Sequence, residues 1–168
     1  MSPNRRVTRT DLPPSSLLAR YAGTGAYTDC YAVDVPGHVS LADFVHAFYT
    51  GFVFRIERWL LRVFLSRPST DLDIARLMSG ESSEFAAWRV EDRTDTQLLM
   101  CDIAARTRSW FMVEPSGAGG TRLYFGSAVV PKLDRRTGKT GLGFLFTALL
   151  GFHRIYSHVL LRAARKRI

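Results

Sequence analysis

The side chains best suited to acid–base or metal chemistry lie within one largely apolar segment, SLADFVHAFYTGFVFRIERWLL. They recur at spacings of three, four and seven residues, which places them on one stripe of a helix: Asp43, His46, Thr50 and Glu57. A carboxylate and an imidazole at i and i+3 can share a metal ion or act together as acid and base. A cluster of hydrogen bonds on a helix surface explains the same pattern, and no HExxH or comparable ligand set accompanies it. The sequence therefore predicts no metal site, and it leaves His46 and Glu57 as candidate polar anchors for a ligand.

A second candidate lies near the C-terminus, in the run Phe152, His153, Arg154. With helical spacing, His153 falls at the edge of an apolar face and Tyr156 follows one turn later. A buried imidazole can donate a hydrogen bond to a ligand oxygen or act as a general base. A structural histidine that hydrogen-bonds its neighbours fits the position equally, so the role of His153 stays open.

The chain has two cysteines, Cys30 and Cys101, and neither belongs to a CxxC pair. Two are too few for a disulfide scaffold, so we expect free thiols and a cytoplasmic location. Cys101 is either a small buried apolar side chain or part of a cavity wall. The glycine-rich SGAGG stretch is typical of a hairpin tip and does not match the phosphate-binding GxGxxG pattern. No catalytic or cofactor signature is present, so we expect no cofactor, and enzymatic activity stays undecided.

The order of the predicted elements indicates an α+β fold. Residues 26–35 alternate as a strand, Ser40 is a suitable N-cap for a helix over 40–65, and residues 70–79 suit a short helix. The period then changes to two in the segments FAAWRVED, TQLLMCDIAA, TRSWFMVEP and TRLYFGSAVVP, which predicts an antiparallel meander. We expect residues 1–24 to form a flexible basic arm and residues 25–168 to form a single domain.

The last segment, GLGFLFTALLGFHRIYSHVLLRAARKRI, predicts a long amphipathic helix. Its longest uncharged run is thirteen residues, Thr140–Phe152, whereas a membrane span needs ~20. The basic residues at its end suit the negative end of a helix dipole, and they lack the aromatic interleaving of a single-strand platform. We therefore expect neither a membrane span nor a nucleic-acid arm.

Strand alternation predicts which side chains face the interior. If Arg89, Arg108 and Arg122 face water, the inward set is Trp88, Val90, Phe111, Val113, Leu123, Phe125, Ser127 and Val129. If Asp102 faces water, then Leu99, Cys101 and Ile103 face the interior. Some of these side chains simply fill a core.

The element order and the segments FAAWRVED, TRSWFMVEP, GTRLYFGSAVVP and LLGFHRIYSHVLLRAA resemble the START-related (SRPBCC, helix-grip) superfamily. The C-terminal half resembles a bacterial family of small START-like domains of unknown function. The resemblance implies a helix-grip fold, in which a curved antiparallel sheet wraps around a long C-terminal helix and encloses an apolar cavity. The predicted cavity wall then comprises Trp88, Cys101, Phe111, Phe125, Ser127, Phe152, His153 and Tyr156.

We expect such a cavity to bind a small hydrophobic or amphipathic ligand, such as a lipid or a polyketide-like aromatic. One alternative is a cyclase- or dehydratase-type enzyme that uses the same cavity, with His153 or Glu57 as acid or base. Another is an interaction domain that forms a homodimer or contacts a membrane surface. The net charge of +8 favours anionic partners such as acidic lipid surfaces, and we expect no nucleic-acid partner.

Overall fold

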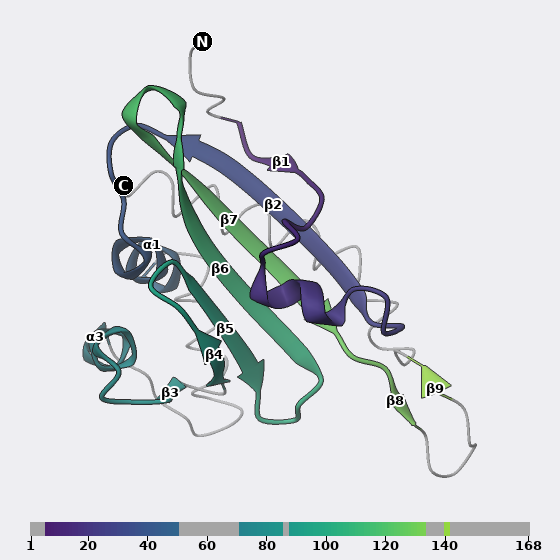
Figure 1. Cartoon of the computed structure of the whole chain (residues 1–168). Helices are drawn as coiled ribbons and strands as arrows, with labels where there is room; N and C mark the ends of the chain where they lie inside the picture. The colour runs from purple at the N-terminus through teal and green to yellow at the C-terminus, as the bar shows by residue number, and fades with distance from the viewer. Residues whose placement is uncertain (1–5, 51–70, 86–87, 134–139, 142–168) are drawn as a thin grey trace.

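The computed structural model describes residues 6–50, 71–85, 88–133 and 140–141. They form an α+β fold built on a seven-stranded antiparallel sheet with the order β1-β2-β7-β6-β5-β4-β3 (Figure 1). The bounds are β1 Thr8–Arg9, β2 Tyr27–Val35, β3 Glu84–Phe85, β4 Trp88–Arg93, β5 Gln97–Asp102, β6 Thr107–Ser116 and β7 Gly120–Val129. A separate pair comprises β8 (Lys132–Leu133) and β9 (Thr140–Gly141). The predicted class and the antiparallel meander are confirmed.

Within the described residues, two α-helices follow the first long strand. Helix α1 spans Leu41–Tyr49 and α3 spans Asp71–Ser79. The Ser40 hydroxyl accepts a hydrogen bond from the Asp43 backbone N–H at 3.1 Å and lies 2.6 Å from the Asp43 carboxylate, so the predicted cap is confirmed. The rest of the helix predicted over 40–65 and the C-terminal helix lie outside the described residues.

Both faces of the sheet are buried, and each has its own apolar cluster. The first face, which carries Tyr31, Phe111 and Phe125, packs against α1 and α3. The second face carries Leu99, Trp110 and other apolar side chains. Figure 1 shows the short 3-10 helix η1 (Leu17–Tyr21) crossing in front of this second face. A second 3-10 turn, η2 (Gly117–Gly119), links β6 to β7.

Residues 6–24 differ from the flexible arm expected at the N-terminus. Strand β1 pairs with β2, and η1 packs on the second face with Leu18 fully buried. Ser16 caps η1, because its hydroxyl accepts a hydrogen bond from the Ala19 N–H at 3.1 Å. The physical reason is the segment's own apolar content: Leu12, Leu17, Leu18 and Tyr21 all pack in the cluster on the second face.

The predicted inward set is correct for β6 and β7 and wrong for β5. Leu98 and Met100 face the first cluster, whereas Leu99 pairs with Trp110 on the second face. Ile103 is 57% exposed. The segment QLLMCD does not reveal which of its residues face the first cluster, because side chains on both faces of β5 are apolar and buried.

Candidate ligand-binding site

A row of large apolar side chains crosses the first face of the sheet. Tyr31, Phe125, Phe111 and Leu98 lie on β2, β7, β6 and β5, and each is the direct partner of the next. Directly opposed residues of antiparallel strands place their side chains about 5 Å apart on one face. All four are buried, so the row forms a continuous apolar wall, here called the aromatic row.

Helix α1 packs its own aromatic rings on this row. The Phe48 ring lies 4.8 Å from the Phe111 ring and 4.6 Å from the Phe125 ring, measured between centroids. Phe44 meets Phe111 edge-on at 5.6 Å. Phe111 and Phe125 were predicted to line a cavity, but the structure packs them against α1, and Phe111 is 0% exposed. Their rings are therefore core at this end of the face.

A polar row lies next to the aromatic row, two residues further along each strand. It begins with Asp29, Ser127 and Ser109, which are direct partners across β2, β7 and β6, and it continues into the apolar Met100 and Val90. Ser109 and Val90 are half-buried, whereas Asp29 and Ser127 are buried. Successive rows on one face are about 6.5 Å apart, so the polar row directly adjoins the aromatic row.

Asp29 is the buried carboxylate of the polar row, with 3% of its surface exposed. Its Oδ1 accepts hydrogen bonds from the Ser127 hydroxyl at 2.5 Å and from the Ser127 backbone N–H at 3.1 Å. The Tyr27 hydroxyl lies 3.4 Å from Oδ2. Hydrogen bonds to a carboxylate are stronger than those between neutral groups. Sequence reasoning omitted Asp29 from the site, although alternation with Tyr31 and Val33 already placed it on the apolar side of β2.

The other predicted site residues do not gather at one place. Trp88 packs half-buried against the first cluster, close to the polar row. Cys101 is the direct partner of Arg108 and Arg89 and so lies on the second face, away from Phe111. His46 is exposed on α1. The remaining four lie outside the described residues: Glu57, Phe152, His153 and Tyr156.

On the second face, a single glutamine holds the N-terminal segment against the sheet. The Gln97 side-chain oxygen accepts hydrogen bonds from the Leu17 N–H at 2.8 Å and from the Trp110 indole N–H at 2.9 Å, and its amide donates to the Ser15 carbonyl at 3.1 Å. Leu18 then fits over Gly126, where an added Cβ would lie 2.9 Å from the leucine Cδ2. The segment is thus fixed by both polar and apolar contacts.

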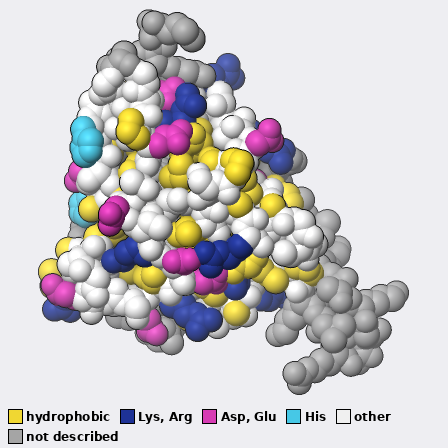
Figure 2. Space-filling view, viewed as in Figure 1, with side chains coloured by type: hydrophobic (Ala, Val, Ile, Leu, Met, Phe, Trp, Pro, Cys, Tyr) yellow, Lys and Arg dark blue, Asp and Glu magenta, His cyan; other side chains and the backbone are white. Residues whose placement is uncertain are grey.

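Charged side chains on the second face form ion pairs, one of them next to η1. Arg108, predicted to face water, is largely covered: it forms an ion pair with Glu91 at 2.8 Å and lies over the Tyr21 ring at 5.0 Å. Arg122 forms a bidentate pair with Asp34 at 2.7 and 3.0 Å. In Figure 2, basic and acidic side chains lie next to one another over this view of the molecule. The second face is therefore covered by η1 and by these ion pairs.

Two buried groups make the protein sensitive to alkaline pH. Burial raises the pKa of the Cys30 thiol from 9.0 to about 12, with smaller contributions from the Asp29 and Asp11 carboxylates. Burial and the hydrogen bond to Glu114 raise the pKa of Tyr124 from 10.0 to about 12. Both groups lose their protons at lower pH in the unfolded chain than in the folded protein, so deprotonation favours unfolding.

We expect these two groups to leave the free energy of unfolding unchanged from neutral pH up to about pH 9 and to lower it as pH rises from 9 towards 12. Each group contributes a slope of at most about 1.4 kcal/mol per pH unit between its unfolded and folded pKa. Urea denaturation across this range measures the slope, and Cys30→Ala and Tyr124→Phe should each reduce it. A flat profile up to pH 11 for the unmodified chain would contradict the assignment.

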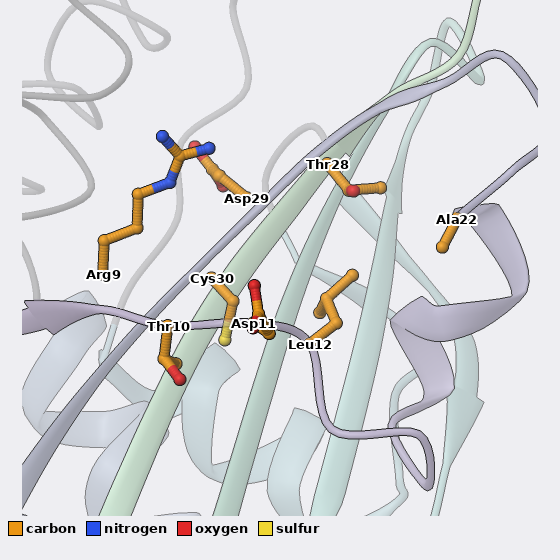
Figure 3. Close-up of a pocket in the computed structure, with 8 residues that line it drawn as sticks. All are labelled: Arg9, Thr10, Asp11, Leu12, Ala22, Thr28, Asp29 and Cys30. Carbon is orange, nitrogen blue, oxygen red and sulfur yellow. The ribbon is translucent and has the colours of Figure 1, made fainter.

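A pocket of about 650 Å³ lies at the open edge of β2, next to the point where the N-terminal chain leaves the sheet (Figure 3). Its lining comprises Arg9, Thr10, Asp11, Leu12, Ala22, Thr28, Asp29 and Cys30. The predicted cavity between the sheet and the last helix involves residues that lie outside the described ranges. Asp29 alone belongs both to this pocket and to the polar row.

Neither metal ligation nor a transmembrane helix is found in the described part of the chain. Within residues 6–50, 71–85, 88–133 and 140–141, no three His, Cys, Asp or Glu side chains are grouped as metal ligands. Over the same ranges, no helix has the length and apolar character needed to cross a bilayer.

Comparison with protein-family models and with curated proteins finds no match. Among solved structures, the crystal structure of CalU16 from Micromonospora echinospora is similar, at 14% sequence identity and a TM-score of 0.38. The alignment covers 99% of this chain and 94% of that chain. The assignment of a site in this chain therefore rests on its own geometry: an apolar wall and a buried carboxylate side by side on the first face.

Proposed function

We propose that this chain binds a small amphipathic ligand, lipid-like or polyketide-like, on the first face of the sheet. The observation that supports the proposal is the pairing of the aromatic row with the polar row. An amphipathic molecule needs an apolar surface for its body and a few fixed polar groups for its head. In this proposal the ligand body lies along the half-buried Val90 and Trp88, and its polar group is held near Asp29 and Ser109.

We infer a helix-grip, START-like arrangement for the whole domain, with the predicted C-terminal helix as the cover of this face. Support comes from the order of the elements, with one long strand and helices before an antiparallel meander, and from the apolar first face. The half-buried Trp88 and Ser109 mark the part of the face that α1 does not fill.

Tryptophan fluorescence provides the test, because Trp88 lies on the first face and Trp110 on the second. With Trp59 replaced by Phe in every sample, we expect a nitroxide-labelled fatty acid to quench the emission of Trp88 and to leave Trp110 largely unchanged. The reason is that nitroxide quenching acts only at short range and the ligand would lie on one side of the sheet.

The matched variants are Trp88→Phe, which should abolish the quenching, and Trp110→Phe, which should preserve it. Mass spectrometry of a denaturing extract of the purified protein should also reveal an apolar molecule. Quenching that survives Trp88→Phe, or no quenching at saturating probe, would refute binding at this face.

A further inference from the structure

The edge of β2 is only partly covered by its neighbour. Strand β1 pairs Thr8 with Ala32 and Arg9 with Tyr31, and the last bond runs from the Thr10 N–H to the Cys30 carbonyl at 3.0 Å. The chain then leaves the edge at Asp11 and crosses to the second face (Figure 3). On this edge, opposite β7, the N-terminal end of β2 therefore has no neighbouring strand among the described residues.

Thr28 presents its backbone to this open edge. In an antiparallel sheet, the N–H and C=O groups of every second residue point to the same neighbour. Because the Cys30 carbonyl points towards β1, the N–H and C=O of Thr28 point towards the same edge, where no described residue pairs with them. Unpaired edge groups of this kind accept an additional strand.

The pocket beside Thr28 has the size and charge to hold such a strand. Its volume is about 650 Å³, within the range of sites that bind small ligands. Figure 3 shows the Arg9 guanidinium near the Asp29 carboxylate, and Asp11 apart from both. Asp11 has no ion-pair or hydrogen-bond partner within the described ranges, so one negative charge remains available on a protein whose net charge is +8.

We propose that this pocket binds the free N-terminus of an extended peptide, which adds to β2 as a short antiparallel strand. An antiparallel strand at this edge runs in the same direction as β1 and begins where β1 ends. Its first residue therefore lies next to Asp11, whose carboxylate binds the peptide ammonium. The following residues exchange backbone hydrogen bonds with Thr28, and Leu12 and Ala22 border the pocket on the apolar side.

The test is a titration of the ¹⁵N-labelled full chain, monitored by amide chemical shifts, with the tetrapeptide amide Val-Thr-Val-Thr and its N-acetylated form. The free-amine peptide should shift the Thr28 and Cys30 amides and slow hydrogen exchange at Thr28. The acetylated form should bind more weakly, because it lacks the ammonium. Asp11→Asn should weaken binding of the free-amine peptide about three-fold, the size expected for an exposed ion pair, and should not affect the acetylated form.

Asp95→Asn, an exposed carboxylate in the β4–β5 turn, is the matched control and should leave binding unchanged. Thr28→Pro removes the edge N–H and should abolish binding of both peptides. Equal affinity for the two peptides, or no shift of the Thr28 amide at millimolar concentrations, would overturn the proposal. These results are independent of fatty-acid quenching at Trp88, so the two proposals can fail separately.

Discussion

Replacing Phe111 by Ala should lower the free energy of unfolding by about 3–5 kcal/mol, the usual cost of removing a fully buried phenylalanine ring. The ring is 0% exposed and occupies the centre of the aromatic row. Its centroid lies 4.8 Å from that of Phe48, 5.3 Å from that of Phe125 and 5.6 Å from those of Phe44 and Tyr49. Truncation leaves a cavity that contacts both the sheet and α1, so neither can close it alone.

Equilibrium unfolding in guanidinium chloride measures this loss. The apolar control is Ile103→Ala, because Ile103 is 57% exposed in the β5–β6 turn, and its replacement should change stability by less than about 0.5 kcal/mol. If Phe111→Ala cost no more than Ile103→Ala, the packing of α1 on the aromatic row would be incorrect.

Replacing Gln97 by Leu should cost about 2–4 kcal/mol and release the N-terminal segment. Leucine has a similar size but cannot pair with the Ser15 carbonyl, the Leu17 N–H or the Trp110 indole, all of which Gln97 satisfies. The indole N–H would then be buried without an acceptor, which costs more than the loss of a solvent-exposed hydrogen bond. We expect amide hydrogen exchange over residues 15–21 to accelerate more than exchange in β6 and β7.

Thr96→Val is the matched control, because Thr96 is the exposed neighbour of Gln97. It should leave both stability and exchange nearly unchanged. Continued protection of residues 15–21 in Gln97→Leu would mean that the apolar contacts of Leu18 hold η1 without help from Gln97.

The sequence predicted the α+β class, the antiparallel meander and the Ser40 cap, because each depends on local pattern. Alternation of polar and apolar residues was sufficient to predict which side chains of β6 and β7 lie on the first face, because charged residues such as Arg122 mark the other face. It failed on β5, where Leu98 and Leu99 are both fully buried on opposite faces. Which of two buried faces a leucine belongs to depends on strand pairing across the sheet, and a single segment does not encode that pairing locally.

The candidate site was predicted less well than the fold. Phe111 and Phe125 were placed on the correct face, but their contacts with α1 depend on tertiary packing. Cys101 was assigned to the wrong face, because the prediction placed the odd-numbered residues of β5 on the first face. Asp29 was missed, because a charged residue in a strand is usually expected to face solvent. Here the carboxylate is buried and accepts a hydrogen bond from the Ser127 hydroxyl of β7. The contributions of Phe152, His153, Tyr156 and Glu57 stay predictions.

The packing of Leu18 over Gly126 has a practical consequence for recombinant expression. A shortened version of the chain that begins near residue 25, chosen because the preceding residues look like a tail, would uncover Trp110 and its apolar neighbours to water. Such a protein should be prone to aggregation, and the same sensitivity applies to bulky affinity tags fused close to Val7.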